Sequence, residues 1–263
     1  MTSVMQQPLA YVHPDAKIAD NVVIDPFSSI AGDVVIESGT WIGPHTTIMD
    51  GARIGKNCKI FPGASISAVP QDLKYSGEET KTVIEDNVTI REYATVNRGT
   101  NDQKKTIVGS NTLLMAYCHV AHDCKIGRHV ILANAVNLAG HVNIDDYAVI
   151  GGMSAVHQFA NIGCHAMVAG GFLVRKDVPP YVKAAREPLS YVGINSIGMR
   201  RRGFENKKIN EIQDIYRYLF LKGYNISQAL IVIEAELPPT EERDRIVSFI
   251  RKSGRGIIRA YKP

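Results

Sequence analysis

The chain has no run of about 18 apolar residues, the length that a membrane-spanning helix requires, so we expect no membrane span. Its first nine residues lack a basic segment followed by an apolar one, and we therefore expect no secretory signal. Only four cysteines occur in 263 residues. Buried, reduced thiols in a cytoplasmic protein are the simplest interpretation of these cysteines.

The basic residues are not interleaved with stacking aromatics, which argues against nucleic acid as a partner. Positive charge is concentrated toward the C-terminus, where residues 189–263 hold 14 Lys and Arg against 8 Asp and Glu, a net charge of +6. The remainder holds 16 basic and 18 acidic residues, a net charge of −2. We therefore expect an anionic partner, such as nucleotide phosphates or an acidic protein, at the C-terminal segment.

What the sequence does contain is an aliphatic residue at every sixth position along most of its length. Counting in sixes from Val12 to Val174 gives 28 positions, of which only Asp72, Glu78 and Asp102 are not aliphatic. Neither an α-helix nor a simple strand produces this period. It is typical of a parallel β-helix, in which each short strand presents one large aliphatic residue to a central core.

The other positions of the hexad agree with this interpretation. A small or β-branched residue stands two positions before most of the aliphatic ones, where a corner leaves little room. Three of the four cysteines occupy such slots: Cys58, Cys118 and Cys124. Asn57 and Asn111 fall where a tight corner favours a left-handed backbone. Three hexads make one triangular coil, so we expect roughly nine or ten coils.

Two segments interrupt the repeat, Ser67–Thr82 and a shorter stretch from about Gly99 to Lys105. Insertions leave a solenoid at its corners and are often binding elements, although a passive surface excursion is the alternative for each. We expect the repeat to end near Val178–Pro180, because proline cannot donate a ladder hydrogen bond.

Beyond the repeat the periodicity becomes helical, with apolar residues at helical spacing from Ile209 to Leu219 and from Ile226 to Ile233. A further helix is expected over Glu241–Ser253, with Thr240 as its cap. The predicted fold is therefore mainly β: a parallel β-helix of hexapeptide repeats over residues 1–188, followed by a small α-helical domain over residues 189–263.

Histidines cluster in the second half of the repeat. Residues one coil apart stack at about the strand spacing of 4.8 Å, which places His122, Gly140 and Gln158 in one column. His141 lies in the column on one side, next to Asp123 and Phe159, and His157 lies in the column on the other side. None of these residues falls in a core position, so we expect outward-facing side chains that form one patch at one edge, not covered by the rest of the chain.

The patch suggests acyl transfer to an alcohol. A histidine beside an aspartate can act as a general base near neutral pH, and the N–H of Gly140 could stabilise an oxyanion. No serine or cysteine sits in a nucleophile motif, which favours direct transfer over an acyl-enzyme. Two alternatives remain open: zinc binding, as in hexapeptide-repeat carbonic anhydrases, although the chain has no pair of histidines separated by four residues, and acetyl transfer from coenzyme A.

Seven segments, in order along nearly the whole chain, resemble the UDP-N-acetylglucosamine O-acyltransferases that begin lipid A biosynthesis. They are Gln71–Tyr75, Arg98–Thr100, His119–Cys124, Leu138–Val142, Gly151–Phe159, Asp177–Tyr181 and Arg201–Phe204. The resemblance implies a left-handed β-helix, a homotrimer, and no cofactor or metal. It further implies that a (R)-3-hydroxyacyl chain on acyl carrier protein is the donor and UDP-N-acetylglucosamine the acceptor. An acidic carrier protein suits the basic C-terminal segment.

The resemblance also implies roles for individual residues. His122 becomes the general base on the glucosamine 3-hydroxyl, Asp123 polarises it, and the Gly140 N–H is the oxyanion donor. Asp72 and His119 resemble sugar contacts, and Asn195 and Arg201 resemble nucleotide contacts. The residues expected to line the same cleft are Gln71, Lys74, His141, His157 and Gln158.

Three positions bear on specificity. Asn97 stands where the family has a histidine and Ile197 where it has an acidic residue, so the contacts to sugar, phosphate or uridine are expected to differ there. Gly170 occupies the position that tunes acyl-chain length, where a glycine leaves the groove open; a corner glycine without such a role is the alternative. The sequence does not distinguish a 3-hydroxyl from a 3-amino acceptor sugar.

Overall fold

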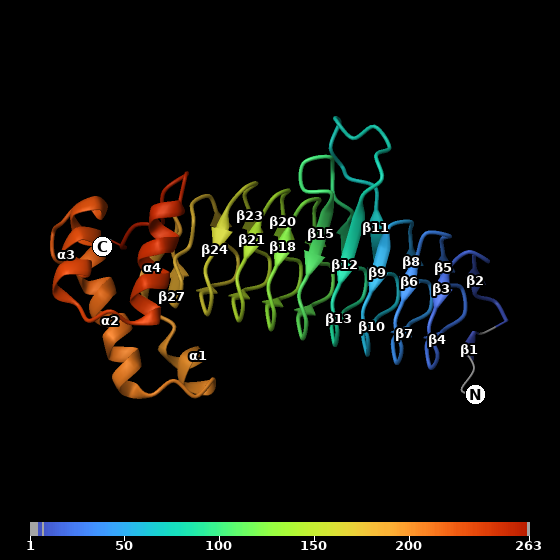
Figure 1. Cartoon of the computed structure of the whole chain (residues 1–263), viewed down its shortest axis with the longest axis horizontal. Helices are drawn as coiled ribbons and strands as arrows, with labels where there is room; N and C mark the ends of the chain where they lie inside the picture. The colour runs from blue at the N-terminus through green and yellow to red at the C-terminus, as the bar shows by residue number, and fades with distance from the viewer. Residues whose placement is uncertain (1–4, 7, 262–263) are drawn as a thin grey trace.

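The structure is a computed structural model, in which residues 5–6 and 8–261 are described. Coils of short parallel strands stack into an elongated β-helix, with α-helices at its C-terminal end and two loops projecting from one edge (Figure 1). The mainly β fold predicted from the hexad pattern is therefore confirmed.

The strands form three sheets, one for each face of the triangular coil. The first face contains β1 (Met5–Gln6), β4 (Val23–Ile24), β7 (Trp41–Ile42), β10 (Lys59–Ile60), β13 (Thr89–Ile90), β16 (Leu113–Leu114), β19 (Ile131–Leu132), β22 (Val149–Ile150), β25 (Met167–Val168), β27 (Val182–Ala185) and β28 (Ser190–Ile194). The second face contains β2 (Tyr11–Val12), β5 (Ser29–Ile30), β8 (Thr47–Ile48), β11 (Ser65–Ala68), β14 (Thr95–Asn97), β17 (His119–Val120), β20 (Asn137–Leu138), β23 (Ala155–Val156) and β26 (Leu173–Val174). The third face contains β3 (Lys17–Ile18), β6 (Val35–Ile36), β9 (Ala52–Ile54), β12 (Lys81–Ile84), β15 (Lys105–Val108), β18 (Lys125–Ile126), β21 (Asn143–Ile144) and β24 (Asn161–Ile162).

The aliphatic residue of each hexad stacks on its equivalent in the next coil. On the first face Ile42 pairs with Ile60 and Ile60 with Ile90, and all three are buried. Full burial of one such side chain is worth about 1.5–3 kcal/mol, so the stack supplies the core one coil at a time. The four cysteines are free thiols inside the protein, as expected.

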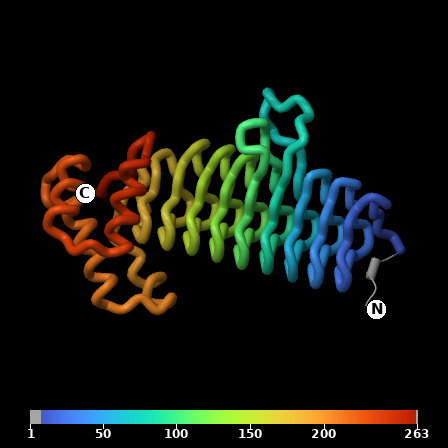
Figure 2. The backbone as a smooth tube through the Cα atoms, viewed as in Figure 1, coloured from blue at the N-terminus to red at the C-terminus, as the bar shows by residue number. Residues whose placement is uncertain are grey.

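Both interruptions of the repeat leave between the second and third faces, in consecutive coils. We call residues 69–80 the first loop, which joins β11 to β12, and residues 98–104 the second loop, which joins β14 to β15. The ladder continues past both, with Ile66 paired to Val96 and Val96 to Val120. The two loops rise side by side from the same edge (Figure 2).

The 18-residue period ends near Val178–Pro180 as predicted, since Val156 pairs with Val174 but Val168 pairs with Ala184, whereas the prediction that the prolines forbid further ladder bonds is wrong. Val178 still bridges to Ile162, β27 pairs in parallel with β25, and β28 then returns antiparallel to β27. The prolines are tolerated because Pro180 lies at a corner, against Gly163, where the ladder needs no N–H donor. The division predicted at residue 188 falls in the turn between β27 and β28 and stays a prediction.

The C-terminal helices are α1 (Ser196–Arg201), α2 (Asn206–Phe220), α3 (Ile226–Glu236) and α4 (Glu241–Lys252). The Thr240 hydroxyl accepts a hydrogen bond from the Arg243 N–H, as predicted for the cap of α4. Buried Asp177 joins this region to the β-helix, because its carboxylate accepts hydrogen bonds from the Asn161 N–H and the Ser253 hydroxyl. No helix within the described residues is long and apolar enough to span a membrane.

Candidate active site

The histidine patch lies on the same edge as the two loops, in the coils that follow them. His122 and Asp123 form the corner between β17 and β18, and Gly140 forms the equivalent corner between β20 and β21. The Val120–Leu138 register stacks these corners as predicted. A Cβ atom added at Gly140 would lie 2.5 Å from His122 Cε1 and 2.6 Å from Nε2, so the absent side chain leaves room for the imidazole.

His122 and Asp123 form a hydrogen-bonded pair. His122 Nδ1 lies 2.9 Å from Asp123 Oδ2, and this contact leaves Nε2 facing outward. Asp123 adopts a left-handed backbone conformation with φ of 58°, which is uncommon for a residue other than glycine. Its backbone N–H donates to the Thr106 hydroxyl at 2.9 Å, which helps to hold this conformation.

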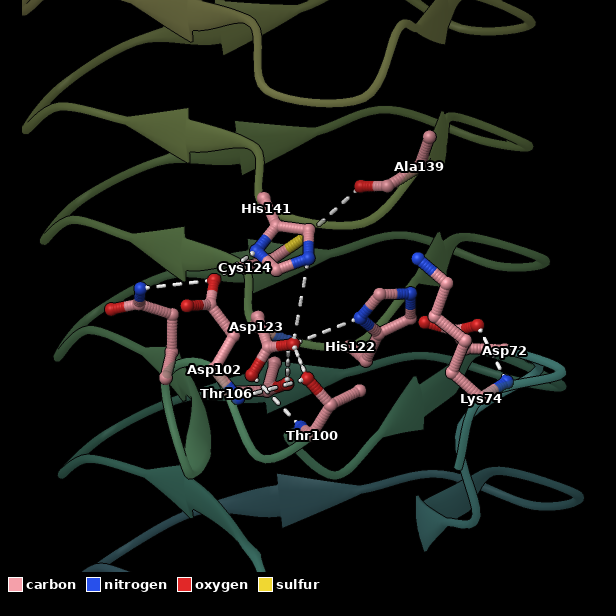
Figure 3. Close-up of polar contacts among 11 residues, drawn as sticks. Asp72, Lys74, Thr100, Asp102, Thr106, His122, Asp123, Cys124, Ala139 and His141 are labelled. Atoms are coloured by element: carbon pink, nitrogen blue, oxygen red, sulfur yellow. Dashed lines mark hydrogen bonds and ion pairs between the residues drawn. The ribbon is translucent and has the colours of Figure 1, made fainter. Parts of the chain in front are cut away.

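The second loop completes the shell of Asp123. The Thr100 N–H donates to Oδ1 at 2.9 Å and the Thr100 hydroxyl to Oδ2 at 2.6 Å (Figure 3). Burial alone would raise the pKa of Asp123, but the hydrogen bonds from Thr100 and His122 and the nearby His141 together bring this pKa below its ordinary value. The carboxylate therefore stays ionised and can stabilise a positive charge on His122.

The expectation of an uncovered, outward-facing patch is wrong in part. The side chains do leave the core, but His122 is only 7% exposed and Asp123 only 4%. The cause is the second loop, which folds back over Asp123. The second loop is therefore not a passive surface excursion, because its residue Thr100 contacts Asp123 directly.

His122 opens onto a cleft of about 750 Å³ over the second face, which we call the first cleft. The predicted residues that line it are Gln71, Asp72, Lys74, His119, His122, Gly140 and Gln158. The first loop forms one wall, and Lys74 extends alongside His122 (Figure 3). His119 Nδ1 lies 2.7 Å from the Thr95 hydroxyl, and burial, together with the nearby His122, lowers the pKa of His119.

His141 stands at the same corner but on its other side. It lines a separate cleft of about 530 Å³ over the third face, together with Asp102, Lys105 and Lys125. Its Nε2 lies 3.7 Å from Asp123 Oδ2, and its ring meets that of His122 edge-on at 5.1 Å. His141 therefore contacts the His122–Asp123 pair, whereas the prediction had placed it in the wall of the first cleft.

Gly140 also contributes an unoccupied donor. Its carbonyl accepts a hydrogen bond from the Phe159 N–H, whereas its own N–H has no acceptor among residues 5–6 and 8–261. The residue is buried and directly adjacent to His122. His122 and Gly140, whose N–H has no acceptor in the described part of the chain, thus line the same cleft side by side.

Several predicted residues lie away from this cluster within one chain. His157 is exposed and lies 3.0 Å from the Gln158 carbonyl oxygen and 3.1 Å from Arg255. Asn195 is buried as the cap of α1, where it donates to the His165 carbonyl and accepts from Gly198. Arg201 is exposed at the end of α1, across the β-helix from the two loops (Figure 1). Gly170 is exposed at a corner between the first and second faces.

The two departures from the family pattern have different surroundings. Asn97 is buried, and its amide donates to the Val69 carbonyl at 3.2 Å, so it ties β14 to the base of the first loop. Ile197 is exposed on α1. Asn97 thus has a structural contact on the loop that forms the wall of the first cleft.

His122, Asp123 and His141 could each offer one ligand atom to a metal ion, and these atoms lie within 4.8 Å of one another. However, His122 Nδ1 and Asp123 Oδ2 already bond to each other, and Oδ2 also accepts from Thr100. A metal ion bound through His122 Nδ1 would have to displace its hydrogen bond to Asp123. As it stands, this hydrogen bond orients the His122 imidazole.

Sequence reasoning missed Thr100, Asp102 and Thr106, which fix the His122–Asp123 pair and His141. Thr106 lies one coil before Cys124. Its position could have been predicted from the repeat, because it occupies the small-residue slot two positions before Val108. Thr100 and Asp102 lie in the second loop, where no periodicity relates them to the stacked columns.

Comparisons with known proteins agree with this geometry. A family model described as UDP-N-acetylglucosamine O-acyltransferase, domain 2, matches residues 177–258, and a bacterial transferase hexapeptide (six repeats) model matches residues 33–68 and 105–140. An acyl-[acyl-carrier-protein]–UDP-N-acetylglucosamine O-acyltransferase from Janthinobacterium sp. (strain Marseille) is 43% identical over 200 residues, which cover 74% of this chain and 76% of that relative.

Solved structures extend the similarity to nearly the whole chain. A UDP-N-acetylglucosamine acyltransferase from Bacteroides fragilis 9343 is 49% identical with a TM-score of 0.95, over 97% of this chain and 100% of that one. The Francisella novicida enzyme is 43% identical with a TM-score of 0.94, over 96% and 93% of the two chains. On these grounds the chain belongs to the UDP-N-acetylglucosamine O-acyltransferase family.

Proposed function

We propose that this chain transfers a (R)-3-hydroxyacyl group from acyl carrier protein to the glucosamine 3-hydroxyl of UDP-N-acetylglucosamine, the first step of lipid A biosynthesis. The observation that carries the proposal is the pairing of a histidine, oriented by a buried carboxylate, with a free N–H at Gly140. The names of the relatives, at 41–43% identity for the curated ones, support the choice of donor and acceptor.

In this proposal His122 Nε2 removes the proton of the 3-hydroxyl as its oxygen attacks the thioester carbonyl. Asp123, whose pKa is low, stabilises the imidazolium that forms. The Gly140 N–H donates to the developing oxyanion. The tetrahedral intermediate then collapses with cleavage of the C–S bond, and His122 returns its proton to the departing thiolate. His122 therefore accepts and returns the one proton that is transferred, and no acyl-enzyme is formed.

The substrate contacts divide between loop and helix. Asp72, Lys74 and His119 in the first cleft are proposed to bind the sugar. Asn195 and Arg201, the cap and the last residue of α1, are proposed to act near the nucleotide, and α1 lies across the β-helix from the first loop of the same chain (Figure 1). A neighbouring copy must therefore bring them to the cleft, which is our reason for proposing a homotrimer with sites between subunits. The net charge of +6 over residues 189–263 suits an acidic carrier protein.

Replacing His122 tests the chemical step. His122→Asn keeps a polar side chain without a titrating base, and we expect a loss of about 10²–10⁴ in kcat. Because His122 is buried, the melting temperature must be measured beside the rate. His13→Asn is the matched control, since His13 also stands near an aspartate but lies in the first coils. Near-normal turnover by a folded His122→Asn variant would refute the assignment.

The same assay separates the alternative functions. Wild-type protein is given either 3-hydroxyacyl carrier protein or acetyl-coenzyme A, with either the 3-hydroxyl or the 3-amino UDP-sugar. We expect the carrier-protein donor and the 3-hydroxyl sugar to react. Stoichiometric zinc in the purified protein, with activity lost on chelation, would instead favour the metal alternative.

Light scattering during the assay tests the trimer. We expect activity to follow the trimer on dilution, because a monomer would leave Arg201 away from the cleft. A monomer that remains fully active at working concentration would contradict the shared site.

A further inference from the structure

The second loop contacts both Asp123 and His141, through residues of different kinds. Thr100 bonds to Asp123, as described above. Two residues later, Asp102 Oδ2 lies 3.2 Å from His141 Nδ1. The same oxygen accepts a hydrogen bond from the Gln103 amide at 3.2 Å. The Asp102 side chain is 59% exposed and that of His141 only 13%, so the carboxylate closes the outer side of the ring (Figure 3).

Apart from the 3.7 Å approach of its Nε2 to Asp123 Oδ2, the His141 ring is held on its other sides by packing. Phe159 stacks against one face, with centroids 4.5 Å apart and planes 18° from parallel, and His122 meets the ring edge-on. Neither contact distinguishes the two ring orientations related by a half-turn about the Cβ–Cγ bond. The choice matters, because one orientation places Nε2 toward Asp123 and the other places a carbon there.

We propose that Asp102 is a positioning residue, whose carboxylate holds His141 Nδ1 outward so that Nε2 faces Asp123 in the catalytic corner. The corner then contains two linked imidazole–carboxylate pairs, His122 with Asp123 and His141 with Asp102, both anchored by one loop. The inference rests on the proposed function for its effect on rate, because it assigns Asp123 to the reaction. The contact between Asp102 and His141 does not depend on the proposed function.

The effect on the reaction follows from what surrounds Asp123. Its carboxylate has the His122 ring on one side and His141 Nε2, at 3.7 Å, on another. His141 contributes to the low pKa of Asp123. If the ring turns, Asp123 loses this neighbour, and the carboxylate that orients His122 is held less firmly in its ionised form.

Asp102 can be changed without releasing the loop. The two hydrogen bonds from Thr100 to Asp123 hold one end, and the Lys81 N–H donates to the Lys104 carbonyl at the other. Asp102→Asn therefore removes the charge and keeps the size and the backbone. Asp102→Glu restores a carboxylate and serves as the conservative variant.

The test is a double-mutant cycle of Asp102→Asn and His141→Ala, with kcat, KM for the UDP-sugar and melting temperature measured for each protein. We expect Asp102→Asn to lower kcat about tenfold, with KM changed less than about twofold, because an outer partner orients a ring without touching substrate. In the His141→Ala background the same change should have no further effect on kcat. Asp102→Glu should recover most of the rate. Asp15→Asn, which breaks a His–Asp contact in the first coils, is the matched control and should leave kcat unchanged.

Either of two results would overturn the proposal: unchanged kcat in Asp102→Asn, or an equal loss in the presence and absence of His141. The melting temperatures distinguish a failure of the Asp102–His141 proposal from a failure of the proposed acyl-transfer function. The pair should show a coupling of about 1–3 °C in the cycle even if wild-type protein does not turn over these substrates. Additive melting temperatures would show that the two side chains do not interact.

Discussion

Gly140→Ala is the sharpest single test of the catalytic geometry, because one methyl group enters the space between the proposed base and the proposed oxyanion donor. The new Cβ would lie 2.5 Å from His122 Cε1 and 2.6 Å from Nε2, below the 3.0 Å that real Cβ contacts respect. Nothing else changes: the backbone N–H of residue 140 is retained, and no unusual backbone angle is required of the alanine.

The displacement sets the magnitude. The His122 ring must move by roughly 1 Å to reach an ordinary contact distance, which also strains the 2.9 Å bond between Nδ1 and Asp123. A misplacement of about 1 Å in a reacting group costs about a hundredfold in rate. We therefore expect kcat/KM to fall about 10²-fold, mainly in kcat, since the sugar contacts of the first loop are untouched.

Gly32→Ala provides the matched control. A Cβ at Gly32 would meet the His13 ring, 3.0 Å from Nδ1, in coils far along the chain from the site. The acyl-transfer assay and melting curves on both variants separate crowding of a histidine in general from crowding of this one. Activity of Gly140→Ala within about twofold of wild type, at full folding, would refute the proposed arrangement, because a 1 Å displacement should not be so well tolerated.

Two further predictions concern acid stability and donor length. The pKa of Asp123 is lowered by folding, so its ionisation contributes stability that is present above its ordinary pKa and is lost as pH falls through the lowered one. Thr100→Val should raise this pKa, remove about 1.5–3 kcal/mol at neutral pH, and move the acid-unfolding midpoint, followed by circular dichroism, to higher pH; an unchanged midpoint would contradict the role of the hydroxyl. Gly170→Met should lower the preference for a sixteen-carbon over a ten-carbon donor by about 60- to 200-fold if three or four methylenes lose their place at about 0.8 kcal/mol each. Because a Cβ at Gly170 would lie 2.9 Å from the Gly152 carbonyl oxygen, Gly170→Ala is needed to measure the strain alone, and an unchanged donor ratio in Gly170→Met would remove this residue from length selection.

The period of six was sufficient to predict the core, the stacked columns and the meeting of His122 with Gly140. Each of these depends on residues that repeat, and the ladder register transmits the repeat from coil to coil. The aspartate, histidine and phenylalanine column was predicted for the same reason, and in the structure Asp123, His141 and Phe159 all share a left-handed corner conformation.

Features outside the repeat could not be obtained in this way. The burial of His122 and Asp123 depends on the second loop, whose residue Thr100 packs back against Asp123. The six-residue period does not determine the path of this loop. The contact of His141 with Asp102 comes from the same loop, which the period does not describe. The prolines misled the prediction that ladder bonds stop, because a rule for strands was applied at a corner, where Pro180 leaves no donor missing.

The two loops leave the β-helix at one corner, and the strands on either side remain paired, with one register shift between Ile66 and Ala68 at the base of the first loop. The register of the ladder therefore sets the backbone spacing of His122 and Gly140, whereas the second loop acts on the orientation of the His122 ring through Thr100 and Asp123. Under the proposed function, residues that hold the substrate and residues that tune the base can vary while the backbone spacing of the proposed catalytic pair is kept. Relatives with different sugar preferences or pH ranges are then expected to differ first in residues 69–80 and 98–104, over an unchanged frame.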